Sequence, residues 1–211
     1  MINKLKEILR KRKTTQLRND LRKTISESEK IREADINSIQ TTWESLKQAG
    51  IHKYDKFYNV CLYSSSVNQD ISILWNNYTL TESKSEKNLY GRLLSMTIIE
   101  FLDDINGLLG KNLRIELISN DMEEFVVVLN KINKSYSNLK TQNNSELRKI
   151  RNNAAAHKTK IAKDLIDFAD KIHYEKLDKI AALTSEINII LNQLSTEVIK
   201  KITKQVEQRN Y

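Results

Sequence analysis

The sequence predicts an all-α protein: a helical bundle with a long C-terminal helix and a basic N-terminal helical extension. The 211 residues include no proline and four glycines, whereas average usage would give roughly ten and fifteen. This composition therefore disfavours folds that need many tight turns, such as sandwiches, barrels and glycine-loop nucleotide folds. The single cysteine, Cys61, excludes disulfide-stapled folds and cysteine-based zinc sites. Apolar residues recur every three or four positions over long stretches, as on one face of an α-helix.

The N-terminal part is expected to contain a basic extension, residues 1–33, and the first helices of a domain that spans residues 34–211. Helical spacing in the extension is weak, at Leu5, Ile8 and Leu9 and then at Leu17, Leu21 and Ile25. A clearer apolar stripe comprises Ile36, Ile39, Trp43 and Leu46. Gly50 follows this stripe and can end the helix in the left-handed conformation. The same spacing resumes after a short turn, at Tyr54, Phe57, Cys61 and Leu62.

Polar clusters predict breaks in the middle of the chain. Residues 64–66 are three serines and are expected to form a loop, after which Asp70 can cap a short helix that holds Leu74 and Tyr78. Residues 79–86 are expected to form another loop. From residue 86 to residue 109 the chain is apolar on nearly every face, which predicts a helix in the middle of the bundle.

The next apolar residues alternate with polar ones, at Leu113, Ile115 and Leu117. This pattern fits a short strand, although a turn of irregular chain suits an all-helical protein better. Asp121 is expected to be the N-cap of a helix that runs to Leu139. Residues 140–144 form a polar connection in this interpretation, and Ser145 starts the next helix.

Two more helices complete the predicted bundle. Thr159 can cap the first, whose inner face holds Ile161, Leu165, Phe168 and Ile172. The second runs from about residue 175 to residue 208, about 50 Å at 1.5 Å per residue. Its apolar seam steps by three and four through Leu177, Ile180, Thr184, Ile187, Leu191, Leu194, Val198 and Ile202. Such a seam packs against another long helix, from this chain or from a second copy.

The formal net charge is +8, and the positive charge is concentrated in two stretches. Residues 1–32 contain eleven basic and four acidic residues, and residues 147–163 contain six basic and no acidic residues. The rest of the chain is negative. Concentrated charge favours a polyanionic partner. The first stretch is either a solvated helix or a nucleic-acid-binding arm.

The second stretch contains a group of side chains that suits RNA cleavage. His157 titrates near neutral pH and could move protons during attack of a 2′-hydroxyl on the adjacent phosphodiester. Arg151 could stabilise the phosphorane-like transition state, and Asn152 could position a phosphate oxygen or the histidine. No metal and no cofactor are expected. Four further basic side chains could bind the RNA backbone: Arg148, Lys149, Lys158 and Lys160.

The motif resembles that of the HEPN (higher eukaryotes and prokaryotes nucleotide-binding) superfamily, whose ribonucleases carry an arginine, a polar residue and, after four to six intervening positions, a histidine. Here the interval between Arg151 and His157 is five residues. The pattern Leu-Arg-x-x-Arg-Asn-x-x-x-Ala-His, followed by a long helix, is similar to the abortive-infection type of HEPN protein. The resemblance covers roughly residues 85–200. It implies an all-helical homodimer that cleaves RNA as a toxin or phage-defence effector, with an antitoxin or another defence protein as a further partner.

The spacing of the motif sets a condition on the site. In a regular helix the Cα atoms of Arg151 and His157 lie about 120° apart around the axis and about 9 Å apart along it, so they do not share a face. A complete site needs a helix irregularity, the reach of the arginine, or the same pair from a second subunit across a two-fold axis. Of the acidic residues in the central helix, Asp104 or Glu100 could orient Arg151, and Asp103 is the third candidate. Alternatively, Glu100 and Asp103 face solvent or bind a lysine.

The remaining candidates favour packing over chemistry. His52 and His173 lack the spacing of a metal site. Cys61 lies on an apolar stripe and is expected in the core. Tyr54, Phe57 and Tyr58 could stack on bases, but aromatic residues at helical spacing more often pack inside.

The first interpretation is thus a metal-independent endoribonuclease of HEPN type in a toxin-antitoxin or phage-defence context. Two alternatives stay open: a non-catalytic HEPN-like domain that binds or senses RNA or a nucleotide, and a helical protein-interaction scaffold. The charged N-terminus and the short apolar runs predict a cytoplasmic protein without a membrane span.

Overall fold

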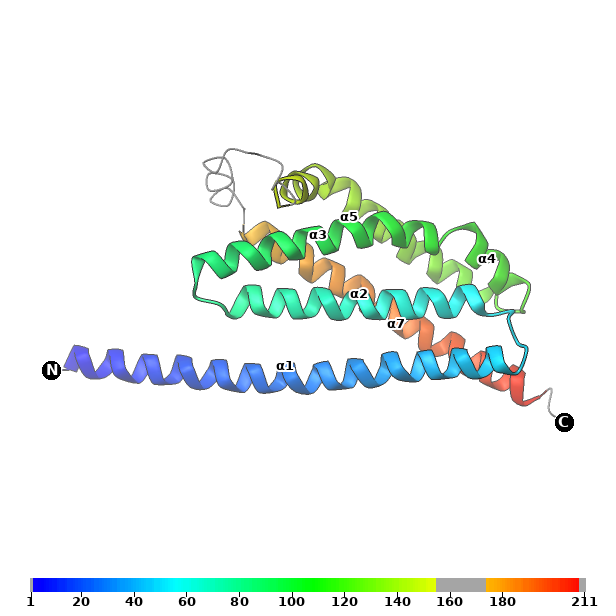
Figure 1. Cartoon of the computed structure of the whole chain (residues 1–211), viewed down its shortest axis with the longest axis horizontal. Coiled ribbons are helices and arrows are strands. Elements are labelled where there is room, and N and C mark those ends of the chain that lie inside the picture. The colour runs from blue at the N-terminus through cyan, green and yellow to red at the C-terminus, as the bar shows by residue number, and fades with distance from the viewer. Residues whose placement is uncertain (1, 155–173, 209–211) are drawn as a thin grey trace.

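The computed structural model describes residues 2–154 and 174–208, and these residues form helices and no strands. This confirms the predicted all-α class. The helices, shown in Figure 1, are α1 (Ile2–Gln48), α2 (Asp55–Leu80), α3 (Lys84–Leu108), α4 (Lys111–Ile118), α5 (Glu124–Ala154) and α7 (Tyr174–Glu207). No helix in this part of the chain is both long and apolar enough to cross a membrane.

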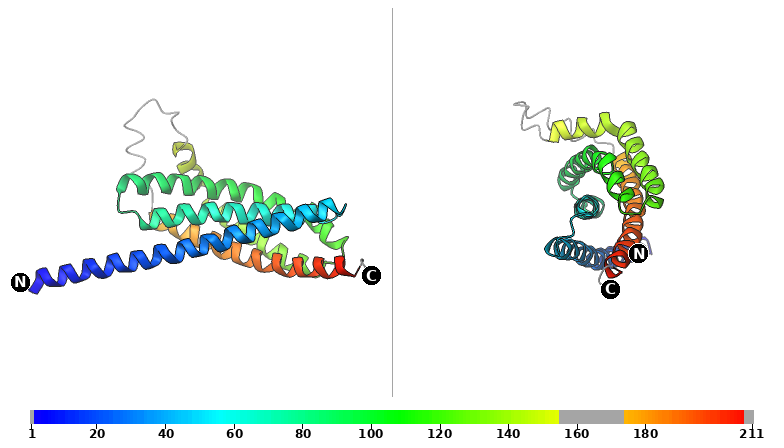
Figure 2. Two further views of the ribbon diagram at one scale, coloured as in Figure 1. Left: turned by 60° about the horizontal axis from the view of Figure 1, so that its bottom comes forward. Right: turned by 90° about the vertical axis from the view of Figure 1, so that its right-hand side faces the viewer.

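Four long helices, α2, α3, α5 and α7, enclose the core (Figures 1 and 2). Helix α3 contacts each of the other three and also α4, which confirms its predicted central position. Its inward residues Leu94, Ile98 and Leu102 are fully buried. Aromatic rings extend the core, and Phe101 and Tyr136 meet edge to face with their centroids 5.4 Å apart. This arrangement buries the continuous apolar surface that the sequence indicates for residues 86–109.

The predicted seam of the C-terminal helix is confirmed. In α7 the eight seam positions are buried, apart from the half-buried Ile187. The seam packs against α2, α3 and α5 of the same chain. The partner of the long C-terminal helix is therefore found within this chain.

A buried hydrogen-bond network joins three helices across the core. The hydroxyl of Tyr136 (α5) donates to Oδ1 of Asn188 (α7), whose Nδ2 donates to Oδ1 of Asn68 (α2) at 2.8 Å. Tyr136 and Asn188 are almost completely buried. Because a buried polar group without a partner is costly, these bonds fix the relative positions of the three helices.

Helix α2 corrects two predictions. It continues through residues 64–66 and through Asp70, where a loop and a new N-cap were expected. The hydroxyl of Ser64 donates to the carbonyl of Cys61 within the helix, and Ser64 is buried. Serine can thus remain in a helix when its hydroxyl bonds to the preceding turn. The predicted loop at residues 79–86 is shorter than expected, because α2 ends at Leu80 and Ser83 caps α3 by accepting a bond from the Glu86 amide.

The segment that follows α3 was also predicted wrongly. Leu113 and Leu117 belong to helix α4 and are buried, while Ile115 between them is exposed. Asp121 is not an N-cap: it has φ 58° and ends α4 in the left-handed conformation. The amides of Asp121 and Met122 bond to the carbonyls of Ile118 and Leu117, which is the Schellman pattern of a helix C-terminus.

Helix α5 replaces two predicted helices and the connection between them. It runs without a break from Glu124 to Ala154, through residues 140–144 and past Ser145. The polar residues of this segment have partners within and beyond the helix. Asn143 Nδ2 donates to the carbonyl of Leu139, and Lys140 binds α3. The predicted helix from Thr159 to Ile172 lies outside the described residues.

Helix α1 is continuous across residues 33 and 34 and ends as predicted at Gly50, which has φ 73°. The amides of Gly50 and Ile51 bond to the carbonyls of Lys47 and Leu46 in a second Schellman motif. Its C-terminal half packs on the bundle through Ile39, Trp43 and Leu46, and Trp43 Nε1 donates to Asp55 Oδ1 at 2.7 Å. None of its residues from 15 to 48 is buried. Its first turns project beyond the bundle (Figure 2).

Candidate functional site

The first two residues of the predicted motif lie on the last turn of α5. Arg151 is half-buried, whereas Asn152 is exposed. Lys149, one of the predicted RNA-binding residues, is also exposed. Three other predicted site residues, His157, Lys158 and Lys160, lie outside the described residues. The structure thus describes the arginine end of the motif, at the surface where α5 ends.

Two side chains of α5, Lys140 and Arg148, bind a carboxylate of α3, and Arg148 lies one helical turn before Arg151. Arg148 Nη2 lies 2.8 and 3.0 Å from the two carboxylate oxygens of Asp103, and Lys140 Nζ lies 2.9 Å from Oδ1. Arg148 Nε also donates to Asn144 Oδ1 at 2.7 Å. Asp103 therefore pairs with a lysine and an arginine, and the Arg148 guanidinium is held from two sides.

The charges around Asp103 keep it ionised. Burial raises the pKa of this carboxyl, but the hydrogen bond and charge of Lys140, with those of Arg148, outweigh burial and hold the pKa below its ordinary value. The two cations are therefore matched by one permanent anion at neutral pH. This anchors the C-terminal part of α5 to α3 and fixes the direction in which the helix presents its last turn.

Arg151 continues the face of α5 that contacts α3. Residues 140, 144, 147 and 151 are spaced by four, three and four, so they share one side of the helix. Helices α3 and α5 run antiparallel (Figure 1). Glu100, about one turn before Asp103 on α3, is exposed. Within the described residues, no carboxylate forms an ion pair with Arg151.

Asp104, the other predicted orienting carboxylate, accepts a hydrogen bond from the hydroxyl of Tyr63 at 2.9 Å. The pKa of Tyr63 lies above its usual range. Desolvation raises it most, followed by the hydrogen bond to Asp104 and the negative charges of Asp104 and Glu100. Tyr63 also stacks on Phe101, with a centroid distance of 6.1 Å. Asp104 thus contacts α2, and the orientation of Arg151 by Asp104 or Glu100 stays a prediction.

The residues that were expected to pack do so. Tyr54, Phe57 and Tyr58 are buried in the core, which leaves no face for stacking on bases. Cys61 is also buried, and its burial raises the thiol pKa to about 12, although a bond with Ser195 opposes the rise. His52 lies 3.3 Å from Asp55 in the turn between α1 and α2, at the other end of the bundle from the end of α5 (Figure 1).

Sequence reasoning did not find the roles of Lys140 and Asn144. Both were assigned to a polar connection, and their contacts with Asp103 and Arg148 depend on one continuous α5. The spacing of 140, 144 and 148 is a usable signal, because polar residues every four positions form a stripe on a helix. If residues 124–154 are taken as one continuous helix, this stripe can be recognised in the sequence.

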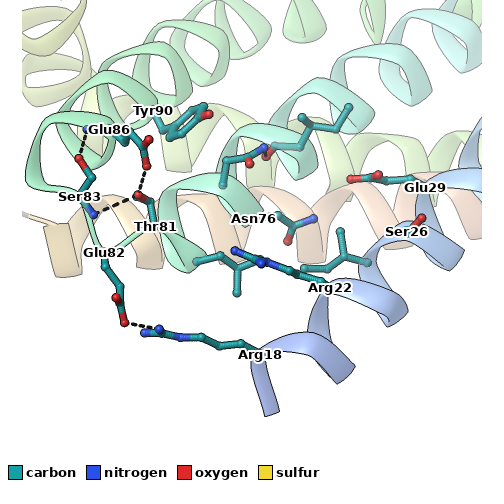
Figure 3. A pocket seen from close by; sticks show the side chains of 14 residues that line it. Arg18, Arg22, Ser26, Glu29, Asn76, Thr81, Glu82, Ser83, Glu86 and Tyr90 are labelled. Carbon is teal, nitrogen blue, oxygen red and sulfur yellow. Dashed lines mark hydrogen bonds and ion pairs between the residues drawn. The ribbon is translucent and has the colours of Figure 1, made fainter. Parts of the chain in front are cut away.

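A cavity lies elsewhere, between α1 and the turn from α2 to α3. It has a volume of about 680 Å³ and is lined by charged and polar side chains from all three helices. Figure 3 shows Arg18 and Arg22 extending from α1 toward it, with Arg18 paired to Glu82. No residue of the predicted motif lines this cavity.

Comparisons of the chain with protein-family models, with curated proteins and with solved structures find no match.

Proposed function

We propose that this protein is a metal-independent endoribonuclease of HEPN type that acts as a homodimer in a toxin-antitoxin or phage-defence context. The observation that carries the proposal is the position of Arg151 and Asn152. They occupy the last turn of α5 at the protein surface, about one turn after Arg148, which binds Asp103.

The anchored turn supports a role for Arg151 in transition-state stabilisation. A cation contributes most when its position is fixed before the reaction, because the protein then does not reorganise as charge develops on the substrate. The bonds from Arg148 and Lys140 to Asp103 restrict movement of α5 against α3 immediately below this turn. Arg151 would then bind the non-bridging phosphate oxygens, while exposed Asn152 donates a further hydrogen bond.

The proposed reaction is an intramolecular transesterification. The 2′-oxygen forms a bond to phosphorus as the bond from phosphorus to the 5′-oxygen breaks. A basic group takes the 2′-hydroxyl proton, and an acidic group protonates the departing 5′-oxygen. His157 would serve in these transfers because an imidazole titrates near neutral pH. The products are a 2′,3′-cyclic phosphate and a 5′-hydroxyl.

The proposal is tested by incubating the purified full-length protein with total RNA in the presence of EDTA. We expect cleavage that leaves 2′,3′-cyclic phosphate ends. His157→Ala should lower the rate about 10²- to 10⁴-fold, and Arg151→Ala about 10²- to 10³-fold. His52→Ala and Arg114→Ala are matched controls, because they remove the same side-chain types from the other end of the bundle.

Two results would contradict the proposal. In one, the wild-type protein leaves RNA intact. In the other, the Arg151 and His157 variants, shown to be folded by circular dichroism, cleave as fast as the two controls. Sedimentation equilibrium tests the dimer separately: a monomer at the concentration of the cleavage assay would rule out a site shared between two subunits.

A further inference from the structure

The cavity between α1 and the turn from α2 to α3 is large enough for a small ligand. Its volume of about 680 Å³ lies within the roughly 300–1,000 Å³ that is typical of small-molecule sites. Side chains of α1, α2 and α3 line it from both sides of the gap (Figure 3). The lining combines polar and charged groups with three aliphatic side chains, Ile25, Ile73 and Leu80.

Two of the three carboxylates in the cavity already have partners. Glu82 forms an ion pair with Arg18, and the carboxylate of Glu86 accepts a hydrogen bond from the hydroxyl of Thr81. Figure 3 shows both contacts at the turn from α2 to α3. The third carboxylate, Glu29, is seven residues after the second arginine of the cavity, Arg22, which is about 10 Å along the axis of α1. Arg22 is therefore the cation of this cavity that no anion matches.

Three neutral polar side chains share the cavity with Arg22. Ser26 lies one turn further along α1, on the same face of the helix. Asn76 projects from α2 and Tyr90 from α3 (Figure 3). In the part of the chain that the structure describes, the side chains of these four residues form no hydrogen bond or ion pair. The cavity thus presents one guanidinium and three neutral hydrogen-bond donors that are available to a ligand.

This set of groups suits a monoanion with an apolar body. A guanidinium binds a carboxylate through two parallel hydrogen bonds, and hydroxyl and amide groups can donate to the same oxygens. A phosphate dianion is less suited, because the lining contains two arginines and three glutamates and so has a net charge of −1. The aliphatic side chains would contact the apolar part of the ligand and remove it from water.

We propose that this cavity binds a small organic carboxylate with an apolar body, and that Arg22 binds its charged end. Because the polar groups come from three helices, the ligand would bridge the gap between α1 and the rest of the bundle. The inference does not depend on the proposed nuclease, since no residue of the predicted motif lines the cavity.

A bridging ligand would hold a part of α1 that is otherwise weakly attached. The side chains of α1 that pack on the core are Ile39, Trp43 and Leu46, all in its C-terminal half. Nearer the N-terminus, the ion pair of Arg18 with Glu82 crosses the gap, and exposed pairs contribute little to stability. Occupancy of the cavity should therefore attach the middle of α1 more firmly to α2 and α3.

Binding is measured with the whole chain and 3-phenylpropionate, which joins a carboxylate to a phenyl ring. Shifts of backbone amide signals in nuclear magnetic resonance spectra, recorded at constant ionic strength, should give a dissociation constant on the order of 1 mM for a ligand of this size. The matched probe 3-phenylpropionamide has the same shape and no charge, and it should bind at least about 10-fold more weakly. Inorganic phosphate at equal concentration should not displace 3-phenylpropionate.

Three variants, shown to be folded by circular dichroism, locate the site. Arg22→Gln should weaken binding of 3-phenylpropionate about 10-fold or more, because it removes hydrogen bonds from a charged donor. Lys23→Gln is the matched control: it removes the same charge from the adjacent residue, which is exposed and does not line the cavity. Its affinity should stay within about twofold of wild type, since salt screens exposed charges. Glu29→Gln removes a negative charge from the cavity and should bind the probe at least as tightly as wild type.

Amide hydrogen exchange tests the bridging role. At ten times the dissociation constant, 3-phenylpropionate should slow exchange in residues 18–29 by up to about 10-fold, because opening then requires release of the ligand. In Arg22→Gln the same concentration should have little effect.

Four results would overturn parts of the proposal. Absence of saturable shifts up to about 10 mM probe, or equal affinities of Arg22→Gln and Lys23→Gln, would overturn the site. Equal binding of the amide and the carboxylate would overturn the role of charge. Displacement by an equal concentration of phosphate would overturn the assignment to a carboxylate, and binding with unchanged exchange in α1 would overturn the bridge. None of these measurements uses RNA, so a failure of the nuclease proposal leaves them unaffected.

Discussion

The network of Tyr136, Asn188 and Asn68 makes a quantitative prediction about the stability of the core. Tyr136→Phe removes one hydroxyl and keeps the ring, so the edge-to-face contact with Phe101 remains. Oδ1 of Asn188 then loses its donor while the side chain stays 1% exposed. A buried acceptor without a partner costs about 1–3 kcal/mol. This is a substantial part of the roughly 5–15 kcal/mol that stabilises a typical domain.

Urea unfolding followed by far-ultraviolet circular dichroism measures this loss. With an m-value of about 2 kcal/mol/M, the unfolding midpoint should fall by about 0.5–1.5 M at unchanged m. Tyr63→Phe is the matched control, because that hydroxyl bonds to the exposed Asp104 and its loss should cost under about 1 kcal/mol. A cost for Tyr136→Phe below about 0.5 kcal/mol, or one smaller than that of the control, would refute the reasoning.

Three further predictions concern the packing and charge of other helices. A Cβ at Gly91 would lie 3.2 Å from the ring of Tyr78, whereas one at Gly107 in the same helix meets nothing within 4 Å. Gly91→Ala should therefore destabilise the protein by about 1 kcal/mol or more in urea unfolding. Gly107→Ala should stabilise it by up to about 1 kcal/mol. A change in unfolding free energy of the same sign for both variants would contradict this reasoning. The depressed pKa of Asp103 contributes stability above its ordinary value of 3.8 that is lost as the pH falls through the folded-state value. The stability advantage of wild type over Asp103→Asn, measured by urea unfolding, should thus be about 1 kcal/mol at neutral pH and shrink in acid, and a pH-independent difference would argue against the ion pairs. Trp43→Phe removes the donor to Asp55 of α2 and should lower the free energy of unfolding by about 1 kcal/mol. Amide hydrogen exchange should then be faster along α1 and unchanged in α3. Faster exchange in all helices would contradict local anchoring of α1.

The parts of the fold that were predictable are those whose information is local. The seam of α7 has regular spacing over eight apolar positions, and this spacing determines which face is buried. Gly50 follows the last apolar position of α1, and a residue without a Cβ accepts the left-handed conformation there. In both cases one helix or one turn contains the whole physical reason for the structure.

The wrong predictions involve residue types that suit more than one conformation. Ser64 looked like a loop residue, but it is small enough to be buried in α2 and bonds to the preceding turn. Lys140 looked like part of a connection, because its partner Asp103 is far away in the sequence. Asp121 has the residue type of an N-cap, yet the same short side chain tolerates the left-handed conformation that ends α4.

The candidate site shows the same division. The motif that begins at Arg151, and its location in a basic stretch, could be identified from residue types and spacing. The anchoring of the preceding turn to α3 could not, because it requires the antiparallel alignment of two helices. Sequence reasoning offered Asp104 or Glu100 as orienting carboxylates and, as the alternative, a lysine partner for Asp103; the structure pairs Asp103 with Lys140 and also with Arg148.

A small cavity between the C-terminal half of α1 and helices α2 and α7 makes the single cysteine a natural reporter of how firmly α1 is attached to the bundle. Cys61 lines a cavity of about 240 Å³ together with Asp35 and Ile39 of α1 and Ser195 of α7. The thiolate is the reactive form, and with a pKa of about 12 the thiol reacts slowly while α1 covers it. A thiol reagent such as dithionitrobenzoate should therefore label the native protein at a rate set by the lifting of α1. Any change that loosens α1, such as Trp43→Phe, should accelerate labelling, which gives a signal of this motion without any engineered probe.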